Sequence, residues 1–142
     1  MKEYVVTFLF TPDFKNVWLI EKQKPEWQKG CLNGIGGKIE ENELPIQAAN
    51  RELFEESGVK DLNLVELGEM LGVNNDSSNF RVYIFTGVTT KELKTMESEE
   101  IDLYPVKFVR DFKTIENVPT LIEASIYRLT GSSNFKKLLM RY

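Results

Sequence analysis

Glu52, Glu55 and Glu56 stand at the spacing that one turn of a helix brings onto a single face. Pro45 suits the first position of such a helix, because its missing N–H would be unpaired there in any case. Gly58 suits the left-handed residue that closes a helix. These signals predict a helix that begins at Pro45 and ends just before Gly58, with three like charges crowded together.

Two interpretations of the crowded glutamates are open. A solvated acidic face is the common outcome for a run of charge. Exposed helices, however, usually place Lys four residues after Glu, whereas Glu52 is followed at that distance by Glu56, and Glu55 by Val59. The carboxylates also lie late in the helix, where the macrodipole disfavours negative charge. A divalent cation such as Mg²⁺ would remove both costs, so the pattern favours a metal site.

A glycine-rich stretch precedes the helix, with Gly34, Gly36 and Gly37 followed by Lys38. These glycines predict a loop whose backbone can approach a ligand closely, and the lysine is available for a phosphate. The spacing is neither that of the Rossmann fingerprint nor that of the P-loop. Beside a metal site, the loop indicates a phosphorylated small molecule held through a bridging cation.

Composition narrows the classes of function. The chain has 142 residues, one cysteine, no histidine and a net charge of −4. Its length predicts one domain over residues 1–142. Cys31 has no internal disulfide partner, and neither histidine catalysis nor a Cys/His zinc site is available. No run approaches the roughly 20 apolar residues of a membrane helix. We therefore expect a cytoplasmic protein with no membrane association and, from the acidic balance, no stable nucleic-acid complex.

The remaining pattern predicts an α/β sandwich around a mixed sheet. Thr11-Pro12-Asp13 separates two β-prone runs and predicts an early hairpin. A second helix is expected from Pro119 to Gly131, with an apolar stripe that packs on the sheet. Strands are expected over residues 4–11, 17–20, 62–73, 80–88 and 104–109.

The stretch over residues 37–59 carries a family resemblance. Gly37, then Glu43, then RELFEESGV from Arg51 match every specified position of the Nudix box, G-x5-E-x7-R-E-U-x-E-E-x-G-U with U aliphatic. The chain thus resembles the Nudix hydrolases of the MutT-like type. The resemblance implies an α/β/α sandwich with a central mixed sheet, and an enzyme that cuts a pyrophosphate bond using water and Mg²⁺ or Mn²⁺.

The resemblance also implies roles for the box residues. Glu52, Glu55 and Glu56 would be the metal ligands, together with the backbone carbonyl of Gly36. Glu52 would be the base that takes a proton from water, with Glu56 also catalytic. Arg51 would orient a carboxylate or a loop.

Two acidic positions outside the metal-ligand set are also expected to contribute. Glu43 is expected to pair with Arg51 in a structural role. In some Nudix enzymes a further carboxylate comes from a loop across the cleft, and the candidates here are Glu97, Glu99 and Glu100, of which Glu100 is preferred. Solvation of that loop explains the three charges equally well.

The substrate is predicted less directly. LNGIGGK over residues 32–38 resembles the W-N-G-x-G-G-K of the branch that sanitises oxidised purine nucleotides such as 8-oxo-dGTP, where the asparagine contacts the base. Leu32 replaces its aromatic residue, and this chain has Asn117-Val118-Pro119-Thr120 where that branch carries paired acidic residues, which Asn117 would replace only in part. A nucleoside triphosphate is the leading substrate. The predicted substrate-binding residues are Asn33, Gly37, Lys38 and Asn117.

Other readings stay open. Hydrolysis of ADP-ribose, dinucleoside polyphosphates or capped RNA ends is a second possibility, and a nucleotide-sensing module without turnover is a third. Trp27 and Phe80 could stack on a base, although aromatic residues in a small α/β domain are expected in the core, as Trp18 is. Lys22 and Lys24 could meet phosphates or be solvated. A monomer and a homodimer are both compatible with the sequence.

Overall fold

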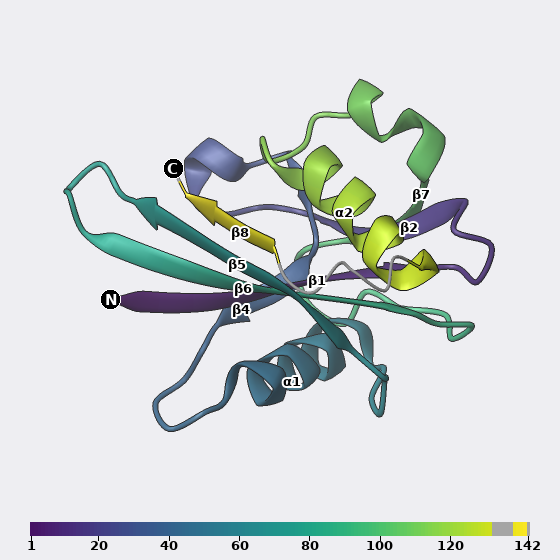
Figure 1. Ribbon diagram of the computed structural model, residues 1–142, viewed down its shortest axis with the longest axis horizontal. Helices are drawn as coiled ribbons and strands as arrows, with labels where there is room; N and C mark the ends of the chain where they lie inside the picture. Colours follow the sequence, from purple (N-terminus) through teal and green to yellow (C-terminus); the bar gives the residue numbers. More distant parts are fainter. Residues whose placement is uncertain (132–137, 142) are drawn as a thin grey trace.

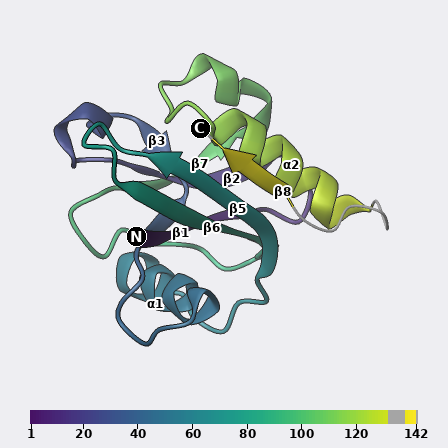
Figure 2. The same ribbon diagram turned by 60° about the vertical axis from the view of Figure 1, so that its left-hand side comes forward.

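The computed structural model of the protein describes residues 1–131 and 138–141. Within this part of the chain, eight strands form one mixed sheet that lies between two α-helices, so that the fold is a three-layer α/β/α sandwich (Figure 1). The turned view places the two helices on opposite faces of the sheet (Figure 2). The helices are α1 (Pro45–Ser57) and α2 (Val118–Thr130), and the short 3₁₀ helices are η1 (Glu26–Gln28) and η2 (Val106–Asp111).

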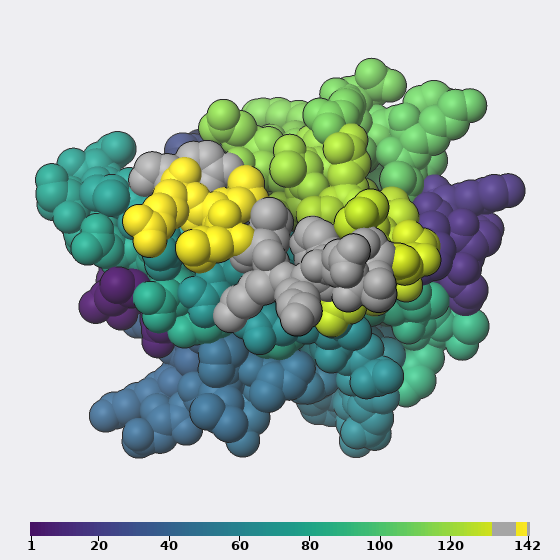
Figure 3. Space-filling model, in the orientation of Figure 1, coloured from purple at the N-terminus to yellow at the C-terminus, as the bar shows by residue number. Residues whose placement is uncertain are grey.

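The sheet has the order β3-β2-β1-β6-β5-β8, with β4 paired to β1 and β7 paired to β2. Its central strand β1 runs parallel to β6 and antiparallel to β2 and β4. The β5–β6 hairpin projects beyond the body of the molecule, and β8 lies at the surface (Figure 3). The strands are β1 (Lys2–Phe10), β2 (Asn16–Glu21), β3 (Leu32–Asn33), β4 (Ile35–Lys38), β5 (Val65–Val73), β6 (Asn79–Val88), β7 (Ile101–Pro105) and β8 (Leu138–Arg141).

The core forms on both faces of β1. Alternate residues of a strand point to opposite faces, so Phe8 joins the apolar cluster under α2, whereas Val5 and Leu9 join the clusters on the α1 side. The strand is buried on both faces from Val5 to Phe10. It therefore fixes both helices relative to one sheet.

Both predicted helices are confirmed. The first spans Pro45–Ser57, and Gly58 closes it at φ 75° while its N–H donates to the carbonyl of Phe54. The second begins one residue before Pro119 and stops before Gly131. Its predicted apolar stripe packs on the sheet, with Leu121 and Ile122 buried and Ile126 and Leu129 half-buried. The early hairpin is confirmed by the antiparallel pairing of β1 with β2.

The predicted glycine loop is wrong. Residues 35–38 instead form β4, which pairs with β1 so that Gly36 lies opposite Val6. A side chain at Gly36 would overlap the backbone carbonyl of Val5, and one at Gly34 would meet that of Thr7. The glycines therefore permit close strand pairing, which spacing alone does not distinguish from a flexible loop.

The strand predicted over residues 104–109 is also placed incorrectly. The observed strand β7 ends at Pro105, which lacks an N–H, and η2 follows it. The N–H of Val106 still donates to the carbonyl of Lys15, next to the last paired residues Asn16 and Pro105, before the chain enters η2. The strand predicted from residue 62 begins only at Val65, and a bulge follows between Glu66 and Gly68.

Candidate active site

Packing of α1 decides where its carboxylates lie. Ala48, Ala49 and Leu53 are buried against the sheet. Glu52 and Glu56 lie four residues apart, beside this buried face, and both are half-buried. Glu55 lies further out, with 47% of its side chain exposed. The helix therefore presents two sheltered carboxylates and one accessible carboxylate.

Gly37 on β4 makes room for one of the sheltered carboxylates. A side-chain carbon at this position would overlap the carboxylate of Glu52. The missing side chain thus lets Glu52 lie against the strand, where Gly36 and Gly37 also form part of a cleft wall. The structure thereby brings the predicted β4 residues together with the predicted helix residues.

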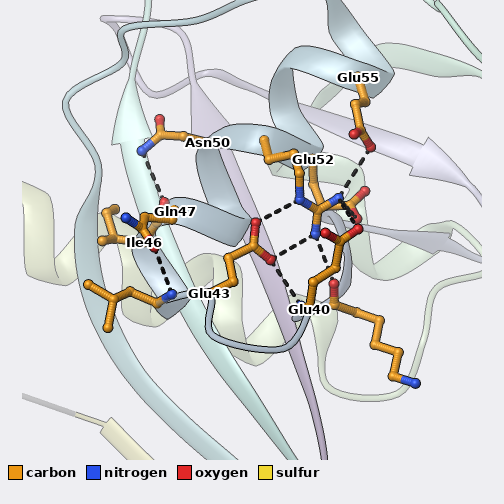
Figure 4. Close-up of polar contacts among 10 residues, drawn as sticks. Glu40, Glu43, Ile46, Gln47, Asn50, Glu52 and Glu55 are labelled. Atoms are coloured by element: carbon orange, nitrogen blue, oxygen red, sulfur yellow. Dashed lines mark hydrogen bonds and ion pairs between the residues drawn. The ribbon is translucent and has the colours of Figure 1, made fainter.

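Arg51 ties the helix to the preceding connection. Figure 4 shows the side chains of Glu40, Glu43, Glu52 and Glu55, which all form ion pairs with it. Its guanidinium donates from Nε to Glu43 at 2.7 Å and from Nη2 to the other oxygen of Glu43 at 3.0 Å, which confirms the predicted pairing in bidentate form. Nη2 also donates to the carbonyl of Lys38 at 3.0 Å, and Nη1 to Glu52 at 2.9 Å. These contacts lower the pKa of the Glu43 carboxyl and raise that of Arg51.

Glu56 has no comparable cation to stabilise it. Burial raises the pKa of its carboxyl to about 8, and the negative charges of Glu52, Glu99 and Glu97 add to the rise, against the opposing effect of Lys22. One of its oxygens, Oε2, is buried without a hydrogen-bond partner. Burial likewise raises the pKa of Glu52, although Arg51 opposes it. A bound cation would supply the charge that this corner of the molecule lacks.

The donor set fits a hard divalent cation. Glu56 has a buried oxygen without a partner, and the negative charge of Glu52 acts on its carboxyl. Carboxylate oxygens are the ligands that Mg²⁺ prefers. Nevertheless, the described residues include no group of three Cys, Asp or Glu side chains arranged to hold one ion. Arg51 instead holds Glu52 at 2.9 Å and Glu55 at 3.3 Å.

The segment before β7 brings acidic residues to the same corner. Its backbone is attached to α1, because the N–H of Met96 donates to the carbonyl of Glu56. The charges of Glu97 and Glu99 act on Glu56. Glu100, the preferred sequence candidate, is exposed, and its carbonyl accepts the N–H of Glu21. The structure therefore favours Glu97 and Glu99 over Glu100 as neighbours of the helix carboxylates.

A cleft of about 540 Å³ is lined by Gly37, which lies against the Glu52 carboxylate, and by Lys22, which pairs with Glu99. All four predicted substrate-binding residues line it, although Asn33 directs its side-chain oxygen to the N–H of Gly34 at 2.8 Å. The amide of Asn117 donates to the sulfur of Met70. Sequence reasoning missed the apolar walls, because such residues resemble ordinary core positions: Val6, Met70, Val82, Ile115, Val118 and Leu121.

The two aromatic candidates also line the cleft. Trp27, on η1, is 71% exposed, so the expectation of a core position is wrong for it. Phe80 lies across from Gly72 on β5, where a side chain would overlap the Phe80 ring. Trp18 is buried, as predicted. The cleft therefore has an aromatic rim and an apolar floor, with carboxylates near one end.

Lys22 and Lys24 are placed differently from each other. Both follow the end of β2, but Lys22 lines the cleft whereas Lys24 is exposed.

The described part of the chain contains no helix with the length and apolar character needed to cross a membrane.

These features define an α/β domain with a carboxylate-rich corner beside a nucleotide-sized cleft. A family model described as the NUDIX domain matches residues 1–120. The chain therefore belongs to the Nudix family, whose hydrolases act on pyrophosphate bonds and generally use divalent metals such as Mg²⁺. No curated protein sequence matches it.

Solved structures share the fold. The NUDIX domain of Shewanella oneidensis NrtR, complexed with ADP ribose, gives a TM-score of 0.77 at 21% identity over 89% of this chain and 87% of its own. A MutT NUDIX hydrolase from Burkholderia pseudomallei gives 0.72 at 14% over 87% and 96%. The E. coli dihydroneopterin triphosphate pyrophosphohydrolase gives 0.69 at 15% over 89% and 95%.

Proposed function

We propose that this protein is a Mg²⁺-dependent pyrophosphohydrolase that converts a nucleoside triphosphate to its monophosphate and pyrophosphate. The observation that carries the proposal is the carboxylate of Glu56, half-buried among other acidic groups with one oxygen unpartnered, beside a nucleotide-sized cleft. A folded protein tolerates such a group most readily when a cation binds it.

Glu52, Glu55, Glu56 and the carbonyl of Gly36 would hold the ion. Bound there, Mg²⁺ or Mn²⁺ would neutralise charge on the phosphates and lower the pKa of a water molecule. Glu52 is the proposed base, because Gly37 lets its carboxylate lie against the strand that lines the cleft. The water oxygen would form a bond to one phosphorus of the α–β anhydride while that anhydride bond breaks. The monophosphate and pyrophosphate would then separate, and the water proton would pass to a Glu52 oxygen.

Positioning falls to the neighbouring residues. Arg51 fixes Glu52 against β4 through Glu43 and the carbonyl of Lys38. Glu97 is the proposed loop carboxylate in place of Glu100, since its charge acts on both Glu52 and Glu56.

The cleft supports a nucleotide with a purine base. Trp27 and Phe80 offer aromatic surfaces for stacking, and Asn33 and Asn117 offer amide groups for a base edge. Oxidised purines such as 8-oxo-dGTP belong to this proposal. Gly37 lines the cleft and lies against the Glu52 carboxylate, and Lys38 follows it in the cleft lining, so a phosphate chain would run here.

Hydrolysis of ADP-ribose is the second candidate, supported by the fold shared with the NrtR domain that was solved with ADP ribose. A sensor without turnover is a third, because an NrtR was also solved with a 27mer DNA. Against this third candidate, the chain keeps every carboxylate of the Nudix box. We propose a cytoplasmic location for the enzyme.

A metal-dependent product screen tests the proposal. Canonical and oxidised nucleoside triphosphates, ADP-ribose, dinucleoside polyphosphates and 5′-triphosphate RNA would each be incubated with the protein and Mg²⁺. Release of pyrophosphate supports the nucleoside triphosphate assignment. AMP with ribose 5-phosphate selects ADP-ribose instead, and nucleotide binding without any product selects the sensor.

A further inference from the structure

Lys22 has an anchored backbone at the cleft wall. Its N–H donates to the carbonyl of Cys31 at 2.9 Å, and its carbonyl accepts the N–H of Gly30 at 2.8 Å. The side chain is 21% exposed and lines the cleft, on the side where its charge also acts on Glu56. Lys22 therefore belongs both to the cleft wall and to the charged surroundings of Glu56.

Glu99 holds the tip of this lysine. The lysine Nζ donates to Oε1 of Glu99 at 3.1 Å, and the backbone N–H of Gln23 donates to Oε2 at 2.5 Å. Both oxygens of the carboxylate are thus engaged, and only 13% of the side chain is exposed. An ammonium has three N–H donors. Glu99 uses one of them, which leaves two for a ligand.

The segment that carries Glu99 is itself attached to α1. The N–H of Lys94 donates to the carbonyl of Ser57, and that of Met96 to the carbonyl of Glu56. The backbone of a helix carboxylate and the tip of the cleft lysine are therefore linked through one short segment. Such a link fixes the position of the lysine charge relative to the proposed metal ligands.

We propose that Lys22 binds a phosphate of the nucleotide and that Glu99 is its positioning residue, which holds the ammonium toward the cleft. This inference rests on the proposed function for the identity of the ligand. A free lysine side chain has up to about 2 kcal/mol of conformational entropy to lose on binding. By ordering Lys22 beforehand, Glu99 removes part of that cost from the binding step.

Positioning of Lys22 by Glu99 and a direct effect of the Glu99 charge predict opposite changes in binding affinity when Glu99 is replaced. Removing a negative charge near a phosphate should tighten binding if Glu99 acts only through its own field. If Glu99 acts through Lys22, its removal should weaken binding. Glu99→Gln tests this directly, because the amide oxygen can still accept the N–H of Gln23 and maintain the local backbone.

The experiment measures the affinity of the whole protein, with Mg²⁺, for a GTP analogue whose bridging oxygens are replaced by methylene groups. Isothermal titration is applied to the wild type, Lys22→Met, Glu99→Gln and the double variant. Glu92→Gln is the matched control, because it removes one charge from the same connection at an exposed position. Circular dichroism and thermal melts check that each variant is folded.

We expect Lys22→Met to weaken binding by about tenfold or more, in line with loss of a charged hydrogen bond. Glu99→Gln should weaken it by roughly threefold to tenfold, from the regained freedom of Lys22. Glu92→Gln should not weaken it, and the double variant should bind no more weakly than Lys22→Met. Lys22→Arg should recover part of the lost affinity.

The inference is overturned if Glu99→Gln binds as tightly as the wild type or more tightly, or if Lys22→Met has no effect. It is also overturned if the losses add in the double variant, since Glu99 would then act independently. If the expected changes in affinity are found but the protein hydrolyses no nucleotide, the role of Lys22 and Glu99 stands and the proposed function fails. A wild type that binds no analogue would overturn both.

Discussion

Glu56 shows how one residue can destabilise a fold and still be useful. Its carboxyl is half-buried near three other acidic groups, and one oxygen lacks a partner. Between its ordinary pKa near 4.5 and about 8, the folded protein keeps a proton that the unfolded chain releases. The free energy of unfolding of the metal-free protein therefore falls as pH rises through this window.

Glu56→Gln should remove this fall in the free energy of unfolding at high pH. At pH 8 without metal, the variant should melt a few degrees above the wild type, whereas at pH 5 the two should be close; about 2–4 °C corresponds to each kcal/mol at this chain length. Added Mg²⁺ should raise the melting temperature of the wild type but not of the variant. Equal melting curves at pH 8, or equal stabilisation by Mg²⁺, would contradict the account.

Trp27 is the side chain proposed to stack on the purine base of the nucleotide. Because it is 71% exposed, Trp27→Ala should change the free energy of unfolding by no more than about 0.5 kcal/mol. Nucleotide binding should weaken by about 1–3 kcal/mol, the range measured for base stacking on aromatic residues. Titration with GTP and with inorganic tripolyphosphate separates the effects, because only GTP has a base. Equal losses for both ligands would argue against stacking.

At the scale of elements, two neighbouring glycines of β4 serve different purposes. A side chain at Gly36 would overlap backbone of Val5, whereas one at Gly37 would meet the end of the Glu52 side chain. Backbone cannot move as easily as a carboxylate. The first glycine therefore supports strand pairing, and the second supports the site.

Gly36→Ala and Gly37→Ala should separate these purposes. We expect the first variant to lose stability by about 1–3 kcal/mol or more through disturbed packing, with denaturant unfolding as the measurement. Gly37→Ala should stay close to the wild type in stability but lose metal-dependent turnover, since Glu52 is displaced. The reverse ranking of the two variants would show that the close approach to Glu52 is unimportant.

The contrast between α1 and β4 shows what the sequence can predict. Pro45 and Gly58 act locally, so the bounds of α1 follow from the residues themselves. The glycines of β4 act through the backbone of β1, some thirty residues earlier in the chain, and the sequence could not distinguish close pairing from a loop. The local sequence likewise predicts a strand over residues 104–109, although residues 106–111 form the 3₁₀ helix η2.

At the scale of the whole molecule, the sheet brings separate segments together at one corner. β4 and α1 contribute the glycines and glutamates of the Nudix box, the end of β2 contributes Lys22, and the segment before β7 contributes Glu97 and Glu99. The box spacing predicted the first group. Sequence reasoning preferred Glu100 in the last group, because adjacent acidic residues differ only in which way the chain turns them.

The role of the helix carboxylates is tested by following pyrophosphate release from nucleoside triphosphates, with and without Mg²⁺, for wild type, Glu52→Gln and Glu56→Gln at equal folded concentration. We expect turnover that EDTA abolishes and that Mg²⁺ or Mn²⁺ restores, and a fall of roughly 10²- to 10⁴-fold in each variant. Metal-independent turnover, or near-wild-type rates in both folded variants, would contradict that role.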